Sequence, residues 1–436
     1  MTDKYFSLDL FVGYKSGMII VVCSAWEGVM ILRKQYLDQI RPFYGTDVIK
    51  VITGLRRSGK SVILEQIRDE IKSMDPQVEI FYLDLEERRN AAYRAKDVLF
   101  NELTKILDLA GERKVAIFLD EIHDVEEWEL QVNSIRKRKN ADIYITGSNS
   151  KLLSGELATY LTGRTVEFEI APFSFAEFRE ATKAYWGELA LGDLFDKYLT
   201  CGGLPFLTQI EFQSQSSRTY LDDLYWAILS KDVMRRLKIR DVDLLDRIVR
   251  FVITEIGHVF SSRSIVRFVK NERRTTTVET VLAYLKACED AFLIRRIDRE
   301  DLIGKRILTV DEKYYVSDLG LRRALVGDLH GEDVDQMLEN VVCREFLRCG
   351  WKVTVGRVRE KEVDFVCQKA GRRRYVQVAY LMPTAETRER EFSALESVPD
   401  QYEKIVLSLD RVDFSRNGVR HAYLPTYLVE LSGEPE

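Results

Sequence analysis

The chain has 436 residues, a length that suits two or three domains. Hydrophobic residues make up 46% of it and charged residues 31%, and the net charge of −5 excludes a general attraction to nucleic acid. Its six cysteines include no C-x-x-C pair, which argues against a disulfide framework or a zinc module and favours a cytoplasmic location.

The N-terminus carries an apolar run at residues 17–32. It is shorter than the roughly 20 residues that a membrane-spanning helix needs, and Glu27 interrupts it. Acidic residues precede it, whereas a signal peptide begins with basic ones. From Met30 the pattern becomes that of an amphipathic helix. We therefore expect no membrane segment, and we expect the functional unit to begin at Met30, with residues 1–29 as an extension of weak order.

Residues 54–61 read Gly-Leu-Arg-Arg-Ser-Gly-Lys-Ser and fit the phosphate-binding pattern G-x-x-x-x-G-K-[ST]. A buried strand is predicted before them at 48–53 and a helix after them, which is the context such a P-loop requires. Backbone N–H groups would hold phosphate oxygens, Lys60 would reach the β- and γ-phosphates, and Ser61 would hold Mg²⁺. The predicted nucleotide contacts are Gly54, Leu55, Arg56, Arg57, Ser58, Gly59, Lys60, Ser61 and Asn149.

A second motif ends in two carboxylates. Residues 114–119 read as a buried strand that Asp120 and Glu121 follow, a Walker B pattern. Asp120 is predicted to hold Mg²⁺, and Glu121 to polarise the attacking water as general base. Side chains alternate along an extended chain, so the two acids can take different roles. The alternative is an ordinary strand followed by a solvated acidic turn.

A third short strand, 142–149, ends in small polar residues. If it lies beside the Walker B strand, Thr146, Ser148 or Asn149 can hold the lytic water or sense the γ-phosphate. The alternative is a strand-to-helix turn in which Ser148 or Asn149 caps the helix.

Arg164 is the predicted arginine finger, a guanidinium that offsets γ-phosphate charge in the transition state. The sequence leaves open whether it acts within its own chain or on a neighbour's site in a homo-oligomer. The alternative is a surface arginine paired with a glutamate. Arg56 and Arg57, inside the P-loop, are weaker candidates that we expect to face solvent or a neighbouring element.

An additional strand at 78–84 lies between the P-loop helix and the Walker B strand, as in ATPases that use a catalytic glutamate. Four or five parallel strands that alternate with helices predict a doubly wound α/β sheet with the nucleotide at the carboxyl ends of the strands. We assign this ATPase domain to residues 30–190.

Several short motifs resemble those of AAA-like ATPases of bacteria and archaea that carry a C-terminal region called domain of unknown function 4143. They lie at 52–61, 119–122 with Trp128 and Glu129, 145–153, 161–164, 172–178 and 202–205. The resemblance runs from Leu32 nearly to the end of the chain. It implies ATP binding, hydrolysis and a winged-helix segment, but it names no biological role.

Residues 191–325 are predicted to be helical and winged-helix-like. Helices at 261–270 and 275–286 have helix-turn-helix spacing, and 291–297 and 313–317 are candidate wing strands. A basic cluster surrounds the second helix: Arg263, Arg267, Lys270, Arg273 and Arg274. It suits contact with DNA phosphates more than with bases. The alternative is a protein-docking or packing module.

Residues 326–436 are predicted to be a nuclease-like α/β domain. A helix glutamate, Glu339, and a strand aspartate, Asp364, match the acids of restriction-endonuclease-like enzymes, which bind magnesium. Gln377 stands where the next acid belongs and Ala379 where the lysine belongs. We therefore expect a nuclease-like fold that is inactive.

The sequence predicts an ATPase that uses ATP and Mg²⁺ and couples nucleotide state to its C-terminal half. One alternative is a nucleotide-gated DNA-binding regulator, and a second is an ATP-controlled DNA nuclease. All three share the same P-loop chemistry.

Overall fold

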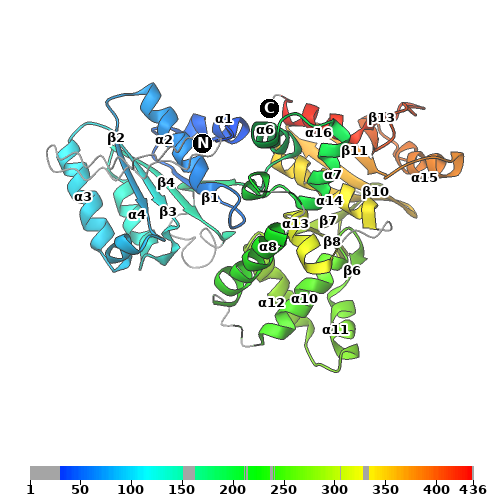
Figure 1. The fold of residues 1–436 in the computed structure, drawn as a ribbon, viewed down its shortest axis with the longest axis horizontal. Coiled ribbons are helices and arrows are strands. Elements are labelled where there is room, and N and C mark those ends of the chain that lie inside the picture. The colour runs from blue at the N-terminus through cyan, green and yellow to red at the C-terminus, as the bar shows by residue number, and fades with distance from the viewer. Residues whose placement is uncertain are drawn as a thin grey trace, which may run out of the picture.

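The computed structural model describes residues 30–150, 163–210, 212, 215–235, 239, 241–304, 306–327 and 333–434. The predicted extension, residues 1–29, therefore lies outside the described residues. Figure 1 shows one sheet and its helices on the left, a second sheet at the upper right, and a group of helices below and between them.

The first sheet has five parallel strands in the order β2-β3-β4-β1-β5. Each strand of β1, β3 and β4 is buried along its whole length, as expected for inner strands covered on both faces. This confirms the predicted parallel α/β sheet. The strands are β1 (Ile49–Thr53), β2 (Glu79–Asp84), β3 (Val115–Asp120), β4 (Ala141–Gly147) and β5 (Thr165–Glu169).

Helices cover both faces of this sheet because successive strand residues point to opposite sides. Ile52 packs with α1 (Lys34–Ile40) and α2 (Lys60–Met74). Its neighbour Val51 belongs to the other core, with α3 (Val98–Ala110) and α4 (Trp128–Arg136).

The middle of the chain is mainly helical. Its elements are α6 (Phe175–Trp186), α7 (Leu191–Cys201), α8 (Gln215–Ala227), the π-helix η6 (Ile228–Met234), α10 (Val242–Thr254), β6 (Val259–Phe260), α11 (Ser262–Asn271), α12 (Val278–Asp290), β7 (Ile294–Asp301), β8 (Arg306–Val316) and α13 (Leu319–Val326). Strands β7 and β8 pair antiparallel, and β6 pairs with β8. We call residues 175–326 the helical region.

The second sheet has eight strands in the order β13-β12-β11-β10-β9-β7-β8-β6. Strand β7 pairs in parallel with β9, so the sheet continues across the boundary predicted at residues 325 and 326. The C-terminal elements are α14 (Val334–Arg348), β9 (Lys352–Val358), β10 (Lys361–Lys369), β11 (Arg372–Val378), α15 (Ala385–Glu396), β12 (Glu403–Ser408), β13 (Arg420–Tyr423) and α16 (Leu424–Ser432).

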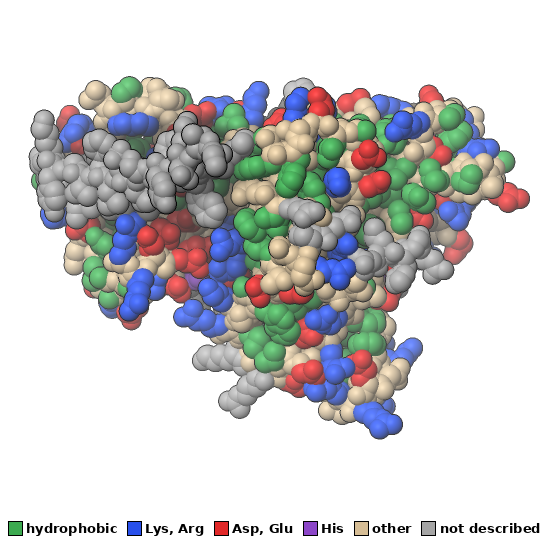
Figure 2. All heavy atoms as spheres, viewed as in Figure 1, with side chains coloured by type: hydrophobic (Ala, Val, Ile, Leu, Met, Phe, Trp, Pro, Cys, Tyr) green, Lys and Arg blue, Asp and Glu red, His purple; other side chains and the backbone are tan. Residues whose placement is uncertain are grey.

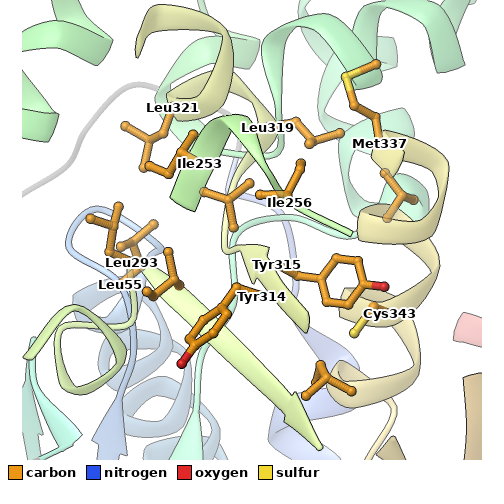
Figure 3. Close-up of a cluster of buried hydrophobic side chains, with 14 of the residues drawn as sticks. Leu55, Ile253, Ile256, Leu293, Tyr314, Tyr315, Leu319, Leu321, Met337 and Cys343 are labelled. Carbon is orange, nitrogen blue, oxygen red and sulfur yellow. The ribbon is translucent and has the colours of Figure 1, made fainter. Parts of the chain in front are cut away.

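One hydrophobic core runs through the helical region and the second sheet. It also takes in Leu55 of the P-loop, which is 1% exposed and lies in the same cluster as Ile253 and Leu293 (Figure 3). The P-loop is thus packed into the neighbouring region. None of the helices in the described ranges is both long and apolar enough to cross a membrane.

The Gly-Gly-Leu-Pro motif at 202–205 has a structural explanation. A Cβ at Gly202 would overlap the carboxylate of Asp318, and one at Gly203 would overlap the backbone oxygen of Phe173. Asp318 accepts a hydrogen bond from the Gly203 N–H at 2.7 Å and caps α13. Gly202 therefore lets the end of α7 meet the start of α13 closely, and Gly203 lets the same loop meet the segment before α6.

Candidate functional site

The P-loop connects the carboxyl end of β1 to the first turn of α2. Gly54 lies so close to the backbone of Ile170 that a Cβ there would overlap its carbonyl oxygen, and Gly59 has φ +100°, a left-handed conformation that favours glycine. The first N–H groups of a helix have no partner inside it, so the start of α2 offers donors to an anion. The predicted strand, loop and helix are all present.

Lys60 and Glu121 face each other across this loop. The Lys60 ammonium donates hydrogen bonds to the carbonyl oxygens of Gly54 (3.2 Å) and Leu55 (3.3 Å), and it lies 3.6 Å from Glu121 Oε1. Burial raises the pKa of Glu121, but the attraction of Lys60 and contact with His123 outweigh it and bring this pKa to about 2. Glu121 is therefore an ionised partner of Lys60.

Asp120 lies at the end of β3, beside Ser61 and Thr146. Burial raises its pKa to about 6, although hydrogen bonds with Ser61 and Thr146 act in the opposite direction. The Thr146 hydroxyl donates to Asp120 Oδ1 and accepts from the Glu121 N–H at 2.8 Å. Thr146 thus joins the two Walker B acids.

Ser148 and Asn149, the other sensor candidates, are turned toward the helical region. The Ser148 N–H donates to Glu121 Oε2 at 3.2 Å, while its hydroxyl donates to Asp232 Oδ1 at 2.8 Å. The Asn149 amide donates to the backbone oxygen of Asp232 at 3.3 Å. Asp232, on η6, was missed in the sequence because no motif marks it.

Arg56 also binds Asp232. Its Nε and Nη2 donate to the two carboxylate oxygens at 3.1 and 3.3 Å, and its Nη1 donates to Glu86 at 3.1 Å. The expectation that Arg56 faces a neighbouring element is confirmed, and Arg57 is exposed.

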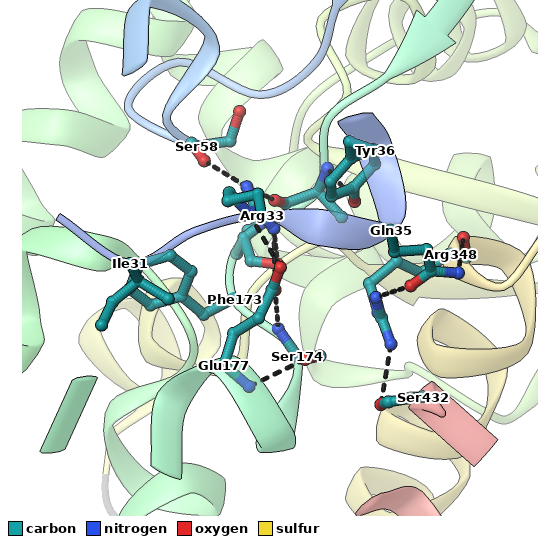
Figure 4. Close-up of polar contacts among 12 residues, drawn as sticks. Ile31, Arg33, Gln35, Tyr36, Ser58, Phe173, Ser174, Glu177, Arg348 and Ser432 are labelled. Atoms are coloured by element: carbon teal, nitrogen blue, oxygen red, sulfur yellow. Dashed lines mark hydrogen bonds and ion pairs between the residues drawn. The ribbon is translucent and has the colours of Figure 1, made fainter. Parts of the chain in front are cut away.

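Arg33 is a second residue that the sequence did not single out. It is 1% exposed, and Figure 4 shows it between the P-loop and α6. Its Nη1 donates to the carbonyl oxygen of Ser58 at 3.0 Å, while its Nε and Nη2 donate to Glu177 at 2.9 Å each. In the sequence, Arg33 is only an arginine that precedes a predicted amphipathic helix, so no pattern marked it as part of the site.

Arg164 is far from the P-loop of its own chain. Its carbonyl oxygen accepts from the N–H of Ile49, at the amino end of β1, whereas the P-loop follows the carboxyl end. Five strand residues at about 3.3 Å each separate the two ends. The sequence left open which chain Arg164 serves. Within its own chain Arg164 does not lie at the P-loop, and its action on a neighbouring chain stays a prediction.

The residues present fit a nucleotide with Mg²⁺. The Ser58 hydroxyl is buried and has no hydrogen-bond partner among the described residues, so the loop retains an unused polar group. Ser61 and Asp120 share a hydrogen bond and supply the hydroxyl and carboxylate oxygens that Mg²⁺ prefers.

The predicted nuclease-like acids meet a lysine. Lys313 of β8 lies 3.3 Å from Glu339 and 2.7 Å from Glu362, and its side chain is 4% exposed. Burial lowers the pKa of Lys313, but Glu339, Asp364 and Glu362 outweigh it and raise this pKa above its ordinary value. Among the residues that the structure describes, no group of three or more histidine, cysteine and acidic side chains is arranged to hold a metal ion.

Gln377 and Ala379 do not restore the missing nuclease groups. The Gln377 amide donates to Glu391 at 3.1 Å, and Ala379 is buried. Asp364 accepts from the Val378 N–H at 2.8 Å. The side chains around Asp364 are therefore engaged in hydrogen bonds within the protein.

The predicted basic cluster lies at an exposed tip around α11. Arg263, Arg267, Lys270 and Arg273 are exposed, whereas Arg274 pairs with Asp243 at 2.6 Å. Figure 2 shows basic side chains at this lower tip with acidic ones among them. The surface is mixed in charge and not a continuous positive patch.

Two families match the sequence. Residues 46–179 match the family described as AAA domain, and residues 192–330 match the family described as domain of unknown function 8612. The expected domain of unknown function 4143 was therefore the wrong family for the region after the P-loop domain. The AAA match agrees with the position of both Walker motifs.

Two curated relatives resemble most of the chain. An uncharacterized protein of Haemophilus influenzae is 36% identical over 381 residues, which are 87% of this chain and 93% of that protein. An uncharacterized protein of Methanocaldococcus jannaschii is 29% identical over 84% of this chain and 80% of its own. Among solved structures, the Walker-type ATPase paby2304 of Pyrococcus abyssi aligns with a TM-score of 0.47 at 14% identity, over 68% of this chain and 96% of that one.

Proposed function

The chain belongs to the family of its Haemophilus influenzae relative and carries an AAA domain, and we propose that it binds ATP with Mg²⁺ and hydrolyses it. One observation carries the proposal. Lys60 and Glu121 stand 3.6 Å apart at the carboxyl edge of a parallel sheet, with Asp120 and Ser61 beside them. Ligands of such sheets bind at this edge.

Each residue has a separate task in the proposed reaction. The P-loop N–H groups and Lys60 hold the β- and γ-phosphates, and Ser61 and Asp120 hold Mg²⁺, which when bound offsets phosphate charge. Glu121 accepts a proton from the attacking water, whose oxygen bonds to the γ-phosphorus. The bond from that phosphorus to the bridging oxygen breaks, and its electron pair leaves with ADP.

Lys60 also controls Glu121 in this proposal. While the two are paired, the pKa of Glu121 is about 2, too low for an efficient base. Phosphate oxygens that draw Lys60 away would remove this attraction and raise the pKa of Glu121. ATP binding would therefore prepare its own general base.

Two matched substitutions test the proposal. Lys60→Ala should abolish ATP binding and Mg²⁺-dependent phosphate release, because it removes the cation that holds the phosphates. Glu121→Gln should keep ATP binding but lower kcat by roughly 10²–10⁴-fold, the usual contribution of a general base. Lys105→Ala, an exposed lysine on α3, is the control. Unchanged turnover in Lys60→Ala would refute the assignment.

We propose that the helical region contains a winged-helix module and that residues 326–436 have a nuclease-like fold. The nucleotide state of the P-loop site would be coupled to both. The order helix, strand, two helices and two paired strands over α10–β8 supports the first. Helix α14 followed by β9, β10 and β11, with Glu339 and Asp364 facing Lys313, supports the second. Gln377 and Ala379 stand where such nucleases have their next acid and their lysine, which argues for an inactive site.

The exposed basic residues of α11 favour one alternative, a nucleotide-gated DNA-binding regulator. It predicts a DNA affinity that falls with salt and changes with ATP. The second alternative, an ATP-controlled nuclease, predicts Mg²⁺-dependent nicking of DNA that Asp364→Ala abolishes. Absence of both effects leaves the ATPase proposal intact and removes the two alternatives.

A further inference from the structure

Two P-loop residues are held by the helical region. Leu55 is buried in the core that the helical region shares with the second sheet (Figure 3), and Arg56 forms a two-point ion pair with Asp232. Asp232 is 2% exposed and lies on the π-helix η6. Single π-helical turns occur frequently at functional sites.

Asp232 connects Arg56 to the Walker B glutamate. Its carboxylate accepts from the Ser148 hydroxyl at 2.8 Å, and the Ser148 N–H donates to Glu121 at 3.2 Å. A continuous chain of contacts therefore runs from Glu121 through Ser148 and Asp232 to Arg56. A contact that only joined two domains would not need to include both the P-loop and the Walker B glutamate of the candidate site.

The charges indicate that Arg56 has an alternative partner. It is joined to Glu121 through Asp232 and Ser148, so its positive charge lies near the candidate site. In the described structure Asp232 and Glu86 neutralise its guanidinium. A γ-phosphate held between Lys60 and Glu121 would compete for it, because a guanidinium binds phosphate in the same two-point manner as carboxylate.

We propose that Arg56 is the catalytic arginine of this site, supplied by the P-loop itself, and that Asp232 is the positioning residue that holds it until ATP binds. This inference rests on the proposed ATPase function. Arg56 offsets the charge that develops on the γ-phosphoryl oxygens as the bond to ADP breaks. When Arg56 leaves Asp232, η6 loses its ionic anchor, and the helical region thereby responds to ATP.

Steady-state kinetics of the full chain test the catalytic role. Arg56→Ala should lower kcat by roughly 10³-fold, the lower end of the usual effect of a catalytic arginine, while KM changes much less. Arg113→Ala, an exposed arginine just before the amino end of β3 and outside the candidate site, should behave as wild type. Equal kcat in Arg56→Ala and Arg113→Ala would overturn the inference. A wild-type chain that neither binds nor hydrolyses ATP would refute the proposed function instead.

Asp232→Asn and hydrogen exchange test the holding role. Asp232→Asn keeps the side-chain shape but removes its charge, so kcat/KM should rise at least about fivefold, the lower limit of ordinary coupling between sites. A non-hydrolysable ATP analogue should speed amide exchange in residues 228–234 of wild type and Arg113→Ala. In Arg56→Ala exchange should already be fast and should not respond. A bound analogue that leaves wild-type exchange unchanged, or an unchanged or lower kcat/KM in Asp232→Asn, would overturn the holding role.

Discussion

Asp120 and Glu121 are neighbours with opposite electrostatic environments. Burial brings the pKa of Asp120 up to about 6, whereas Lys60 helps to bring that of Glu121 down to about 2. Glu121 has φ +52°, an uncommon backbone conformation for a non-glycine residue, and such conformations gather at functional sites. This turn separates the two carboxylates, so one faces Ser61 and the other Lys60.

The pair of Arg33 and Glu177 should make stability depend on pH. Burial raises the pKa of Glu177, but Arg33 outweighs it and this pKa lies below its ordinary value. A lowered folded-state pKa stabilises the fold above the unfolded-state pKa, and this contribution is lost as pH falls through the folded-state value. Glu177→Gln should therefore lose about 3 kcal/mol at pH 7 and depend less on pH below about 4.5.

Urea unfolding at pH 3 to 7 measures this effect. Glu180→Gln, an exposed glutamate on the same helix α6, is the matched control and should follow the wild-type curve. Parallel curves for wild type and Glu177→Gln across this range would contradict the assigned pKa direction.

At the scale of elements, local sequence patterns predicted the P-loop, both Walker strands and the parallel sheet, because each depends on residues close in the chain. The role of Asp232 could not be predicted in this way, because it rests on a contact with Arg56, which is 176 positions away in the sequence. No sequence pattern in either segment indicates that the two residues pair. Arg164 shows a different limit of local patterns. A suitable residue type near the motifs suggested a role but not which chain it serves, and strand direction places Arg164 at the amino end of β1, away from the P-loop of its own chain.

Strand β8 ties the helical region to α14 and β10 through Lys313. Lys313→Met should lower the free energy of unfolding by about 3–5 kcal/mol, since it leaves Glu339, Glu362 and Asp364 without their shared cation. Lys352→Met, an exposed lysine on β9, should change stability little. Thermal and urea unfolding of both variants measure the difference. Equal stabilities would show that the acids are neutral or hydrated without the lysine.

At the scale of the whole molecule, the P-loop contacts two regions at once, the AAA domain to which it belongs and the helical region whose hydrophobic core it shares. Leu55 and Arg56 belong by sequence to the AAA domain but by packing and pairing to the helical region. Arg33 and Glu177 attach the same loop to α6. A displacement of the loop by nucleotide therefore acts on the helical region through several contacts.

The number of chains needed for one active site follows from which arginine completes it. If Arg56 acts within its own chain, phosphate release per chain should not change with protein concentration, and Arg164→Ala should match wild type. If Arg164 instead serves a neighbour's site, the rate per chain should rise with concentration. Mixing Arg164→Ala with Lys60→Ala should then restore activity, because each variant supplies what the other lacks. We expect the first result. Arg56 is connected to Glu121 through Asp232 and Ser148, whereas Arg164 lies at the amino end of β1, away from the P-loop.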